Sequence, residues 1–191
     1  MSTEQRPALR FLIIGTSGAG KTTLATQLEN AFQLPKLSLD TVFWMPEWKQ
    51  RPAEDMQARV GEFVATHPSW VIDGNYFRKI GTLALDKSTH IIWLDPPFWK
   101  FYPILVYRTI RRYFKLEPTC ADGCVEHLRE FYAKDGLLRW IWDEHDKHLQ
   151  KFDNVTKGDP RLIVFRGWDY RTGVQQWFKE VTALYGQKPP Q

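Results

Sequence analysis

The feature that most constrains the fold is a glycine-rich segment at residues 15–22. It reads Gly-Thr-Ser-Gly-Ala-Gly-Lys-Thr and matches the pattern G-x-x-x-x-G-K-[S/T] at every fixed position. An apolar run precedes it and a helical pattern follows it, which is the context of a phosphate-binding loop between a strand and a helix. The alternative, a chance glycine-rich turn, does not require that context.

The residue types of this loop indicate what it binds. Glycines let the backbone curl so that N–H groups point at phosphate oxygens, and the helix that follows adds the positive end of its dipole. We expect Lys21 to reach the β- and γ-phosphates of ATP, and the Thr22 hydroxyl to ligate Mg²⁺. The expected phosphate-binding residues are Gly15, Thr16, Ser17, Gly18, Ala19, Gly20, Lys21, Thr22 and Thr23.

Short apolar runs alternate with longer stretches of helical period along the rest of the chain. This alternation is typical of a parallel sheet covered by helices. It predicts an α/β P-loop NTPase fold with a five-stranded parallel sheet and helices on both faces. The predicted strands are 9–14, 36–39, 70–73, 90–94 and 161–165, and the predicted helices begin in the loop, near 52, near 97, near 125 and before 174.

Composition narrows the class of protein. A length of 191 residues fits one domain at about 150 residues per domain. We expect that domain to span 1–191 with a lid insert at about 112–125, where Pro118 and Gly123 interrupt the helical pattern. Apolar residues at 43% and charged residues at 25% exclude a disordered or fibrous chain.

Charge and cysteine content point to the environment. The net charge of +4 is a mild bias toward anionic ligands, far below that of a dedicated nucleic-acid binder. Two cysteines cannot build a disulfide framework, and no apolar run approaches the roughly 20 residues that cross a bilayer. We therefore expect a cytoplasmic protein without membrane partners.

Three apolar runs end in an aspartate, and these are candidate magnesium ligands. Asp40, Asp73 and Asp95 would all lie at the carboxyl edge of a parallel sheet, where such folds bind ligands. Spacing alone does not rank them. Asp95 precedes Pro96 and Pro97, which favours a role as a helix N-cap.

Longer motifs resemble one family over most of the chain. Residues 15–22, Leu39-Asp40 followed by Trp44, Trp-Val-Ile-Asp-Gly-Asn-Tyr at 70–76 and Ile-Ile-Trp-Leu-Asp at 91–95 resemble the DNA topology modulation proteins. The match continues at Arg108, Arg111, Arg112, Gly123-Cys124 and residues 140–142. These are small P-loop proteins similar to adenylate kinase and shikimate kinase, so the resemblance implies an adenylate-kinase-like fold.

The resemblance also implies roles for single residues. Asp73-Gly74 matches the adenylate kinase dipeptide of the metal and phosphate site, and Arg78 matches the arginine that binds the phosphate of the acceptor. Asp40 stands where shikimate-kinase-like proteins have a carboxylate on the acceptor side. The chain departs from Phe-Pro-Arg with Asn-Tyr-Phe-Arg at 75–78, which puts a nucleoside monophosphate acceptor in doubt.

A basic stripe follows from helical spacing. Arg108, Arg111, Arg112 and Lys115 recur at i, i+3, i+4 and i+7. Arginine suits charge that develops on a migrating phosphoryl group, and in adenylate-kinase-like proteins arginines at this place belong to the lid. We expect Arg108 and Arg112 to be catalytic. The alternative is a solvated basic face.

Several other residue groups have competing interpretations. Cys120, Cys124 and His127, like His145, Asp146 and His148, lack the spacing of a structural zinc site, so free thiols and a solvated helix face are expected. Phe43, Trp44 and Trp48 either contact substrate or form a small packing cluster. Gly167-Trp168 is a candidate adenine contact. The tryptophans expected in the core are Trp70, Trp93, Trp140, Trp142 and Trp177.

Together these features predict transfer of the γ-phosphoryl group of ATP, with Mg²⁺, to a small-molecule or nucleotide acceptor. The predicted catalytic residues are Lys21, Asp40, Arg78, Arg108 and Arg112, and the predicted metal ligands are Thr22 and Asp73. The alternatives are a nucleic-acid-associated ATPase or regulator and a nucleotide-binding module without turnover. The acceptor, the preference between ATP and GTP and the oligomeric state are not encoded in these motifs.

Overall fold

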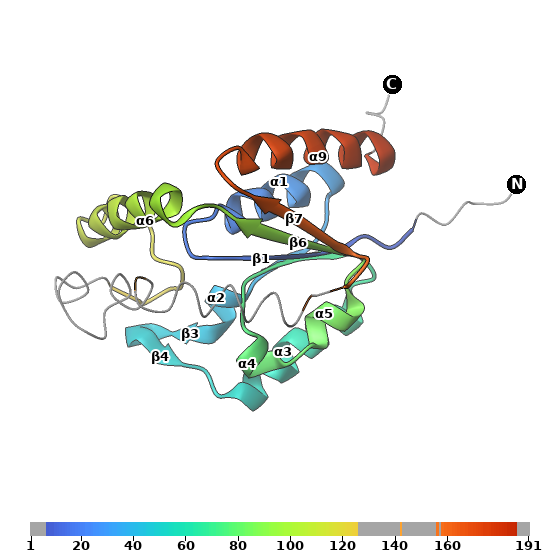
Figure 1. The fold of residues 1–191 in the computed structure, drawn as a ribbon. Helices are drawn as coiled ribbons and strands as arrows, with labels where there is room; N and C mark the ends of the chain where they lie inside the picture. The colour runs from blue at the N-terminus through green and yellow to red at the C-terminus, as the bar shows by residue number, and fades with distance from the viewer. Residues whose placement is uncertain (1–6, 126–141, 143–155, 157, 187–191) are drawn as a thin grey trace, which may run out of the picture.

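Five parallel strands form one sheet with the order β2-β5-β1-β6-β7 (Figure 1). In the computed structural model, which describes residues 7–125, 142, 156 and 158–186, every predicted strand is present with its ends within one residue of the prediction. The α/β prediction is therefore confirmed. The strands are β1 (Arg10–Gly15), β2 (Lys36–Ser38), β5 (Trp70–Asp73), β6 (His90–Asp95) and β7 (Leu162–Arg166).

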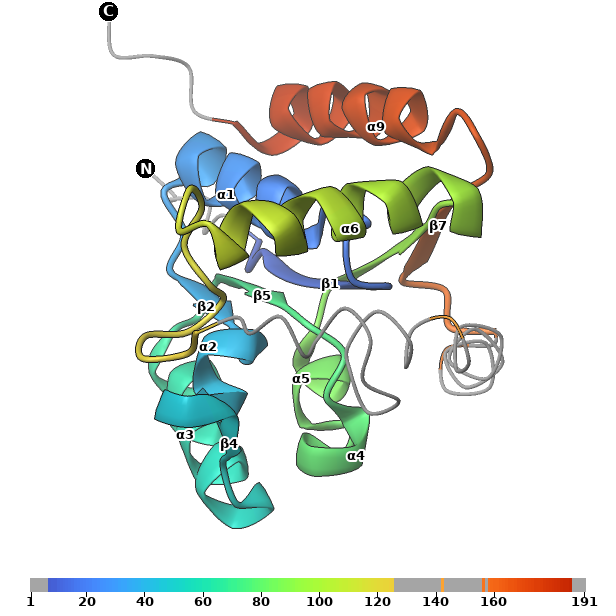
Figure 2. The same cartoon turned by 90° about the vertical axis from the view of Figure 1, so that its left-hand side faces the viewer.

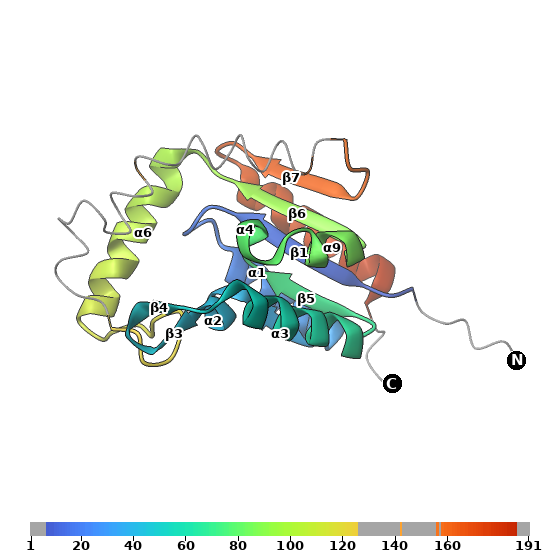
Figure 3. The ribbon, with the colours of Figure 1, turned by 90° about the horizontal axis from the view of Figure 1, so that it is seen from below.

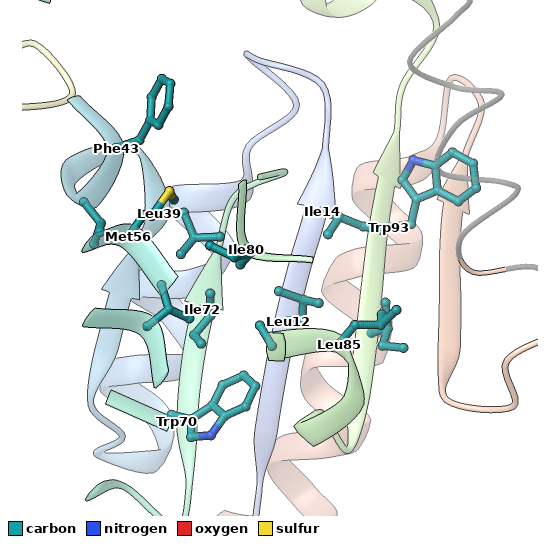
Figure 4. Close-up of a cluster of buried hydrophobic side chains, with 14 residues drawn as sticks. Leu12, Ile14, Leu39, Phe43, Met56, Trp70, Ile72, Ile80, Leu85 and Trp93 are labelled. Atoms are coloured by element: carbon teal, nitrogen blue, oxygen red, sulfur yellow. The ribbon is translucent and has the colours of Figure 1, made fainter. Parts of the chain in front are cut away.

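The central strands are apolar on both faces because helices cover both. Along β1, Leu12 and Ile14 enter one hydrophobic cluster, and Phe11 and Ile13 enter the cluster on the opposite face. Side chains of this size contribute about 1.5–3 kcal/mol each when they are fully buried. Figure 4 shows the first cluster, where residues of β1, β5 and β6 meet those of the covering helices.

The helices lie in two layers (Figures 1 and 2). α1 (Lys21–Phe32) and α9 (Tyr170–Tyr185) cover one face, while α3 (Ala53–Thr66), α4 (Phe77–Ile80) and α5 (Leu83–Lys87) cover the other. Helices were predicted where α1, α3 and α9 lie, whereas the short helices α4 and α5 were not predicted. Among the described helices, none combines the length and the apolar character that crossing a membrane requires.

The remaining elements gather at the carboxyl ends of the strands. α6 (Phe98–Tyr113) crosses this edge of the sheet, and a small hairpin lies near its far end (Figure 3). The hairpin follows the short helix α2 (Leu39–Phe43), and the sequence predicted only an irregular segment there. It consists of β3 (Trp44–Met45), the 3₁₀ turn η1 (Pro46–Trp48) and β4 (Lys49–Gln50).

The tryptophans expected in the core divide into three groups. Trp70 and Trp93 are buried, and Trp177 is half-buried against the α1 side of the sheet. The prediction for Trp142 is wrong, because its side chain is 49% exposed. Helical spacing does not distinguish burial in the core from packing on a surface, and Trp142 packs against rings of α6. Trp140 and most of the helix predicted near 125 lie outside the described residues. The ring partners of Trp142 are Phe98, Trp99 and Tyr102.

Candidate active site

The phosphate loop connects β1 to α1 and depends on backbone conformations that favour glycine. Gly15 has φ +143°, and a Cβ atom there would lie 2.3 Å from the carbonyl oxygen of Leu94 on β6. Gly18 and Gly20 also have positive φ. The first turn of α1 follows Gly20 without a side-chain cap, which leaves N–H groups available to a bound anion.

Lys21 folds back onto this loop. Its Nζ atom donates to the carbonyl oxygens of Gly15 and Thr16, each at 3.0 Å. Burial lowers the pKa of Lys21 below its ordinary value, while the negative charges of Asp40 and Asp73 act in the opposite direction. The ammonium group therefore lies where it can exchange weak carbonyl contacts for phosphate oxygens.

Thr22 and Asp73 form the second part of the site. The Thr22 hydroxyl donates to Oδ2 of Asp73 at 2.8 Å, and Asp73 is only 1% exposed. Oδ1 of Asp73 makes no hydrogen bond to any residue that the structure describes. Burial raises the pKa of Asp73, and the Thr22 bond and the Lys21 charge offset this only in part.

These atoms fit a magnesium ion. A buried carboxylate oxygen without a partner, beside a threonine hydroxyl, provides hard oxygen ligands for a cation that otherwise takes phosphate oxygens and water. In the described part of the chain, no three His, Cys, Asp or Glu side chains form a metal cluster, so a cage made entirely of protein is not found there.

Asp40 lies in the first turn of α2, across the site from the phosphate loop. Its Oδ1 accepts a hydrogen bond of 2.6 Å from the hydroxyl of Tyr76. The negative charge of Asp40 acts on the pKa values of Lys21, Asp73 and Arg108, so the charges of these four side chains lie within electrostatic range of one another.

α6 supplies the basic residues. Burial and the neighbouring Arg112 lower the pKa of Arg108. Nε of Arg108 and Nε of Arg111 lie 3.9 and 3.8 Å from the carboxylate oxygens of Glu117. Arg78, on α4, is exposed, and no hydrogen bond or ion pair joins it to these residues within the described ranges.

The segment after α6 contacts the hairpin of residues 44–50. The Glu47 N–H donates to the carbonyl of Gly123 at 3.0 Å, and the Trp48 indole N–H donates to the carbonyl of Val125 at 2.7 Å. The Cys124 thiol lies 3.4 Å from the carbonyl of Met45. His127, His145, Asp146 and His148 lie outside the described residues.

The cysteines of this segment are free thiols. Burial, together with the charge of Asp40, raises the pKa of Cys120 to about 11, and Cys124 is buried. The two cysteines form no disulfide. Free thiols in place of metal ligands stay a prediction, because His127 lies outside the described residues.

Of the aromatic residues near Asp40, Phe43 is the one for which the structure decides between the two interpretations that the sequence left open. Phe43 is 6% exposed and belongs to the hydrophobic core, with its ring 4.6 Å from those of Trp44 and Tyr76. Trp44 and Trp48 are half-buried, with their rings 5.4 Å apart. Packing therefore accounts for Phe43. Trp168 is 61% exposed after β7, and Lys100 lies over its ring.

One expectation at this edge is wrong. Asp95 does not cap a helix, because α6 begins after Pro97 without a side-chain cap. Parallel pairing of β6 with β7 places Asp95 beside Arg166, and the two side chains form an ion pair. Asp95 is buried and its charge is paired with that of Arg166, whereas Oδ1 of Asp73 has no hydrogen-bond partner among the described residues.

Sequence reasoning missed three residues that hold the site together. Asn75 bonds to the backbone of Gly15, Tyr76 bonds to Asp40, and the buried Tyr170 donates to the carbonyl of Ala19 at 3.2 Å. Asn75 and Tyr76 directly follow the Asp-Gly dipeptide, so their place in that motif was an available signal. Nothing in the local sequence indicates the contact of Tyr170.

Comparisons with known proteins support the fold but assign the chain to no family. No family model matches the chain, and no curated protein matches it. Two examples of similar solved structures are kinases or described as such. A gluconokinase from Sinorhizobium meliloti 1021 has a TM-score of 0.51 at 13% identity, covering 95% of each chain. A protein described as a proposed kinase from Chloroflexus aurantiacus j-10-fl has a TM-score of 0.52 at 15% identity, covering 96% of this chain and 100% of the other.

At these identities the likeness concerns the fold. The chain has a P-loop NTPase fold. The DNA topology modulation family, which the motifs resemble, is not shown by any of these comparisons.

Proposed function

We propose that the protein is a phosphotransferase that moves the γ-phosphoryl group of ATP to a hydroxyl group of a small acceptor. The observation that carries this proposal is a second carboxylate within electrostatic range of a phosphate and metal site. Lys21, Thr22 and Asp73 would form that site, and the charge of Asp40, which is held by Tyr76, acts on Lys21. A simple nucleotide-binding module has no need of the second carboxylate.

On the nucleotide side, residues 15–23 would bind the phosphate chain through backbone N–H groups and Lys21. Thr22 and the free oxygen of Asp73 would hold Mg²⁺. The ion, when bound, neutralises charge on the phosphate oxygens. Lys21 would keep the transferring group in place, since its ammonium is confined by the loop carbonyls.

On the acceptor side, Asp40 would accept the proton of the attacking hydroxyl. Arg108 and Arg112 would stabilise charge on the migrating group from α6, and Arg78 would bind an anionic group of the acceptor. The fold likeness to a gluconokinase supports an acceptor that is a small hydroxyl compound. The departure at 75–78 argues against a nucleoside monophosphate.

We further propose that residues 1–191 act as one unit whose lid insert, at about 112–125, closes the site from the α6 side. The contacts of Gly123 and Val125 with the hairpin support this. The geometry of α6 does not favour the nucleic-acid alternative, because Arg108 and Arg111 lie near Glu117 and do not form an open basic track.

The test is a screen of ATP consumption against nucleosides, nucleotides, sugars and polyol acids, with detection of the phosphorylated product. Lys21→Ala should abolish turnover while the protein remains folded. Lys179→Ala, which changes an exposed lysine of α9, should behave as the wild type. Full turnover by folded Lys21→Ala would overturn the proposal, and nucleotide binding without product for any acceptor would favour a binding module.

A further inference from the structure

The last residue of β5 and the turn that follows it contact both halves of the site. Asp73 accepts from Thr22, Asn75 bonds to Gly15, and Tyr76 donates to Asp40. Asp73 and Asp40 have places in the proposed reaction. Asn75 touches neither reacting group, and its two bonds go to the backbone of the phosphate loop.

Those bonds continue the sheet by one further step. The ladder between β1 and β5 ends where the Gly74 N–H donates to the carbonyl of Ile13 at 3.1 Å. Beyond it, Oδ1 of Asn75 accepts from the Gly15 N–H at 2.9 Å, and Nδ2 of Asn75 donates to the Gly15 carbonyl. A primary amide offers the same donor and acceptor as a peptide group, so the side chain replaces the next residue of a strand.

The conformation of the turn places the Asn75 side chain beside β1. Gly74 has φ +136°, and a Cβ atom at this position would lie 2.7 Å from Cβ of Leu39. A side chain here would push the turn away from α2, and Asn75 would move away from β1. The glycine thus allows the backbone to leave the sheet while the next side chain reaches back to it.

Gly15 is the residue on which Lys21 depends. Its carbonyl accepts from Nδ2 of Asn75 and also from Nζ of Lys21. Contact with Leu94 restricts Gly15 on the β6 side, and the amide of Asn75 restricts it on the β5 side. The peptide that opens the loop is therefore fixed from both directions, and its carbonyl sets where the lysine ammonium lies.

We propose that Asn75 is a positioning residue of the phosphate loop, which acts through Gly15 to place Lys21 for the phosphate chain of the nucleotide. The inference rests on the proposed nucleotide function. It assigns Asn75 to the binding of the triphosphate and not to the base or the acceptor, because both of its bonds go to the loop.

The test uses binding of inorganic tripolyphosphate and of ATP, each with Mg²⁺, measured by titration calorimetry. Asn75→Ala and Asn75→Leu both remove the two bonds, and leucine keeps the approximate volume. We expect each to weaken both ligands by about tenfold, and by the same factor, since both ligands share the phosphate chain. Gln57→Ala is the matched control, because this exposed amide donates to the carbonyl of Lys79 outside the site. It should leave both affinities unchanged.

A double variant separates positioning from a general loss of structure. In a Lys21→Ala background, Asn75→Ala should change tripolyphosphate affinity by less than threefold, because the lysine through which Asn75 acts is gone. Equal losses in both backgrounds would overturn the proposal, as would affinities within twofold of the wild type.

The two proposals fail in different ways. If the wild type binds neither ATP nor tripolyphosphate, both proposals fall, whereas normal binding by the Asn75 variants overturns only this one. If neither Asn75 variant folds, amide hydrogen exchange of the wild type tests whether Asn75 holds Gly15. The Gly15 N–H should be protected without ligand because Asn75 accepts it, and rapid exchange there would overturn the assignment.

Discussion

Replacing Asp73 by asparagine should stabilise the metal-free protein while abolishing its response to magnesium. Asp73 is 1% exposed, and its Oδ1 atom makes no hydrogen bond to the described residues. Burial disfavours the charged form of this carboxyl group. The amide of asparagine carries no charge and its oxygen can still accept from Thr22, while its NH2 group takes the place of the unpaired oxygen. We therefore expect a gain of about 1–2 kcal/mol from removing the buried charge, with no new hydrogen bond.

That gain corresponds to about 2–8 °C in melting temperature for a chain of this length. The measurement is thermal unfolding in EDTA and again with Mg²⁺ and ATP. The wild type should gain stability from the ligands by mass action, and Asp73→Asn should gain much less because the metal ligand is missing.

The pKa of Asp73 fixes the direction in which folding stability changes with pH. The raised pKa of Asp73 means that the folded state binds this proton more tightly than the unfolded chain does. The wild type therefore loses stability as the pH rises above the ordinary aspartate value of 3.8. The advantage of Asp73→Asn should shrink as the pH falls toward that value.

Asp95→Asn is the control at the same edge of the sheet, with the opposite expected sign. Asp95 is buried but paired with Arg166, whose side chain is 63% exposed and therefore screened by solvent. Losing this pair should destabilise the protein by about 1 kcal/mol and leave the magnesium response intact. If Asp73→Asn is destabilised as Asp95→Asn is, or keeps a wild-type response to magnesium, the reasoning is refuted.

Three further outcomes are expected. Tyr76→Phe should lower kcat/KM for the acceptor about tenfold at an unchanged ATP affinity, and an equal loss in an Asp40→Asn background would contradict a role through Asp40. Iodoacetamide should alkylate Cys120 at pH 8 roughly 100-fold more slowly than an exposed cysteine, because the pKa of Cys120 is about 11. The alkylation rate is measured by mass spectrometry of the Cys120 peptide, and a rate equal to that of an exposed cysteine would contradict the prediction. Arg108→Ala and Arg112→Ala should raise the transfer barrier by about 2–4 kcal/mol with little effect on ATP binding. DNA should bind at about 10⁻⁴–10⁻⁶ M at physiological salt; tight binding lost in these two variants, with turnover unchanged, would favour the nucleic-acid alternative.

The sequence predicted those parts of the fold that strong local signals encode. The central strands β1, β5 and β6 were located within one residue because they are continuous apolar runs, buried on both faces. The edge strands β2 and β7 are only partly buried. The phosphate loop was located because its glycines and Lys21 occupy fixed spacings. Trp142 shows the limit of such patterns, since the same spacing describes a core side chain and an exposed one.

Features that depend on tertiary contact could not be predicted. The pairing of Asp95 with Arg166 joins residues 71 positions apart and requires the register of β6 with β7. The hairpin of residues 44–50 has strands of two residues, and its turn places Glu47 and Trp48 at positive φ, which neither residue type signals. Asn75 lies within the motif at residues 70–76, but its partner Gly15 becomes evident only when β5 lies beside β1.

The bond between Tyr170 and Ala19 has a consequence for biosynthesis. The two residues are 151 positions apart, so a loop made early on the ribosome is braced by a side chain made late. The central strand β1 likewise has to wait for β5 and then for β6 before both of its edges are paired. A nascent chain that has exposed only the loop and α1 therefore holds the complete motif in an unsupported form. Competence to bind nucleotide should arise late in translation, when β7 and the start of α9 dock, rather than when the motif itself emerges.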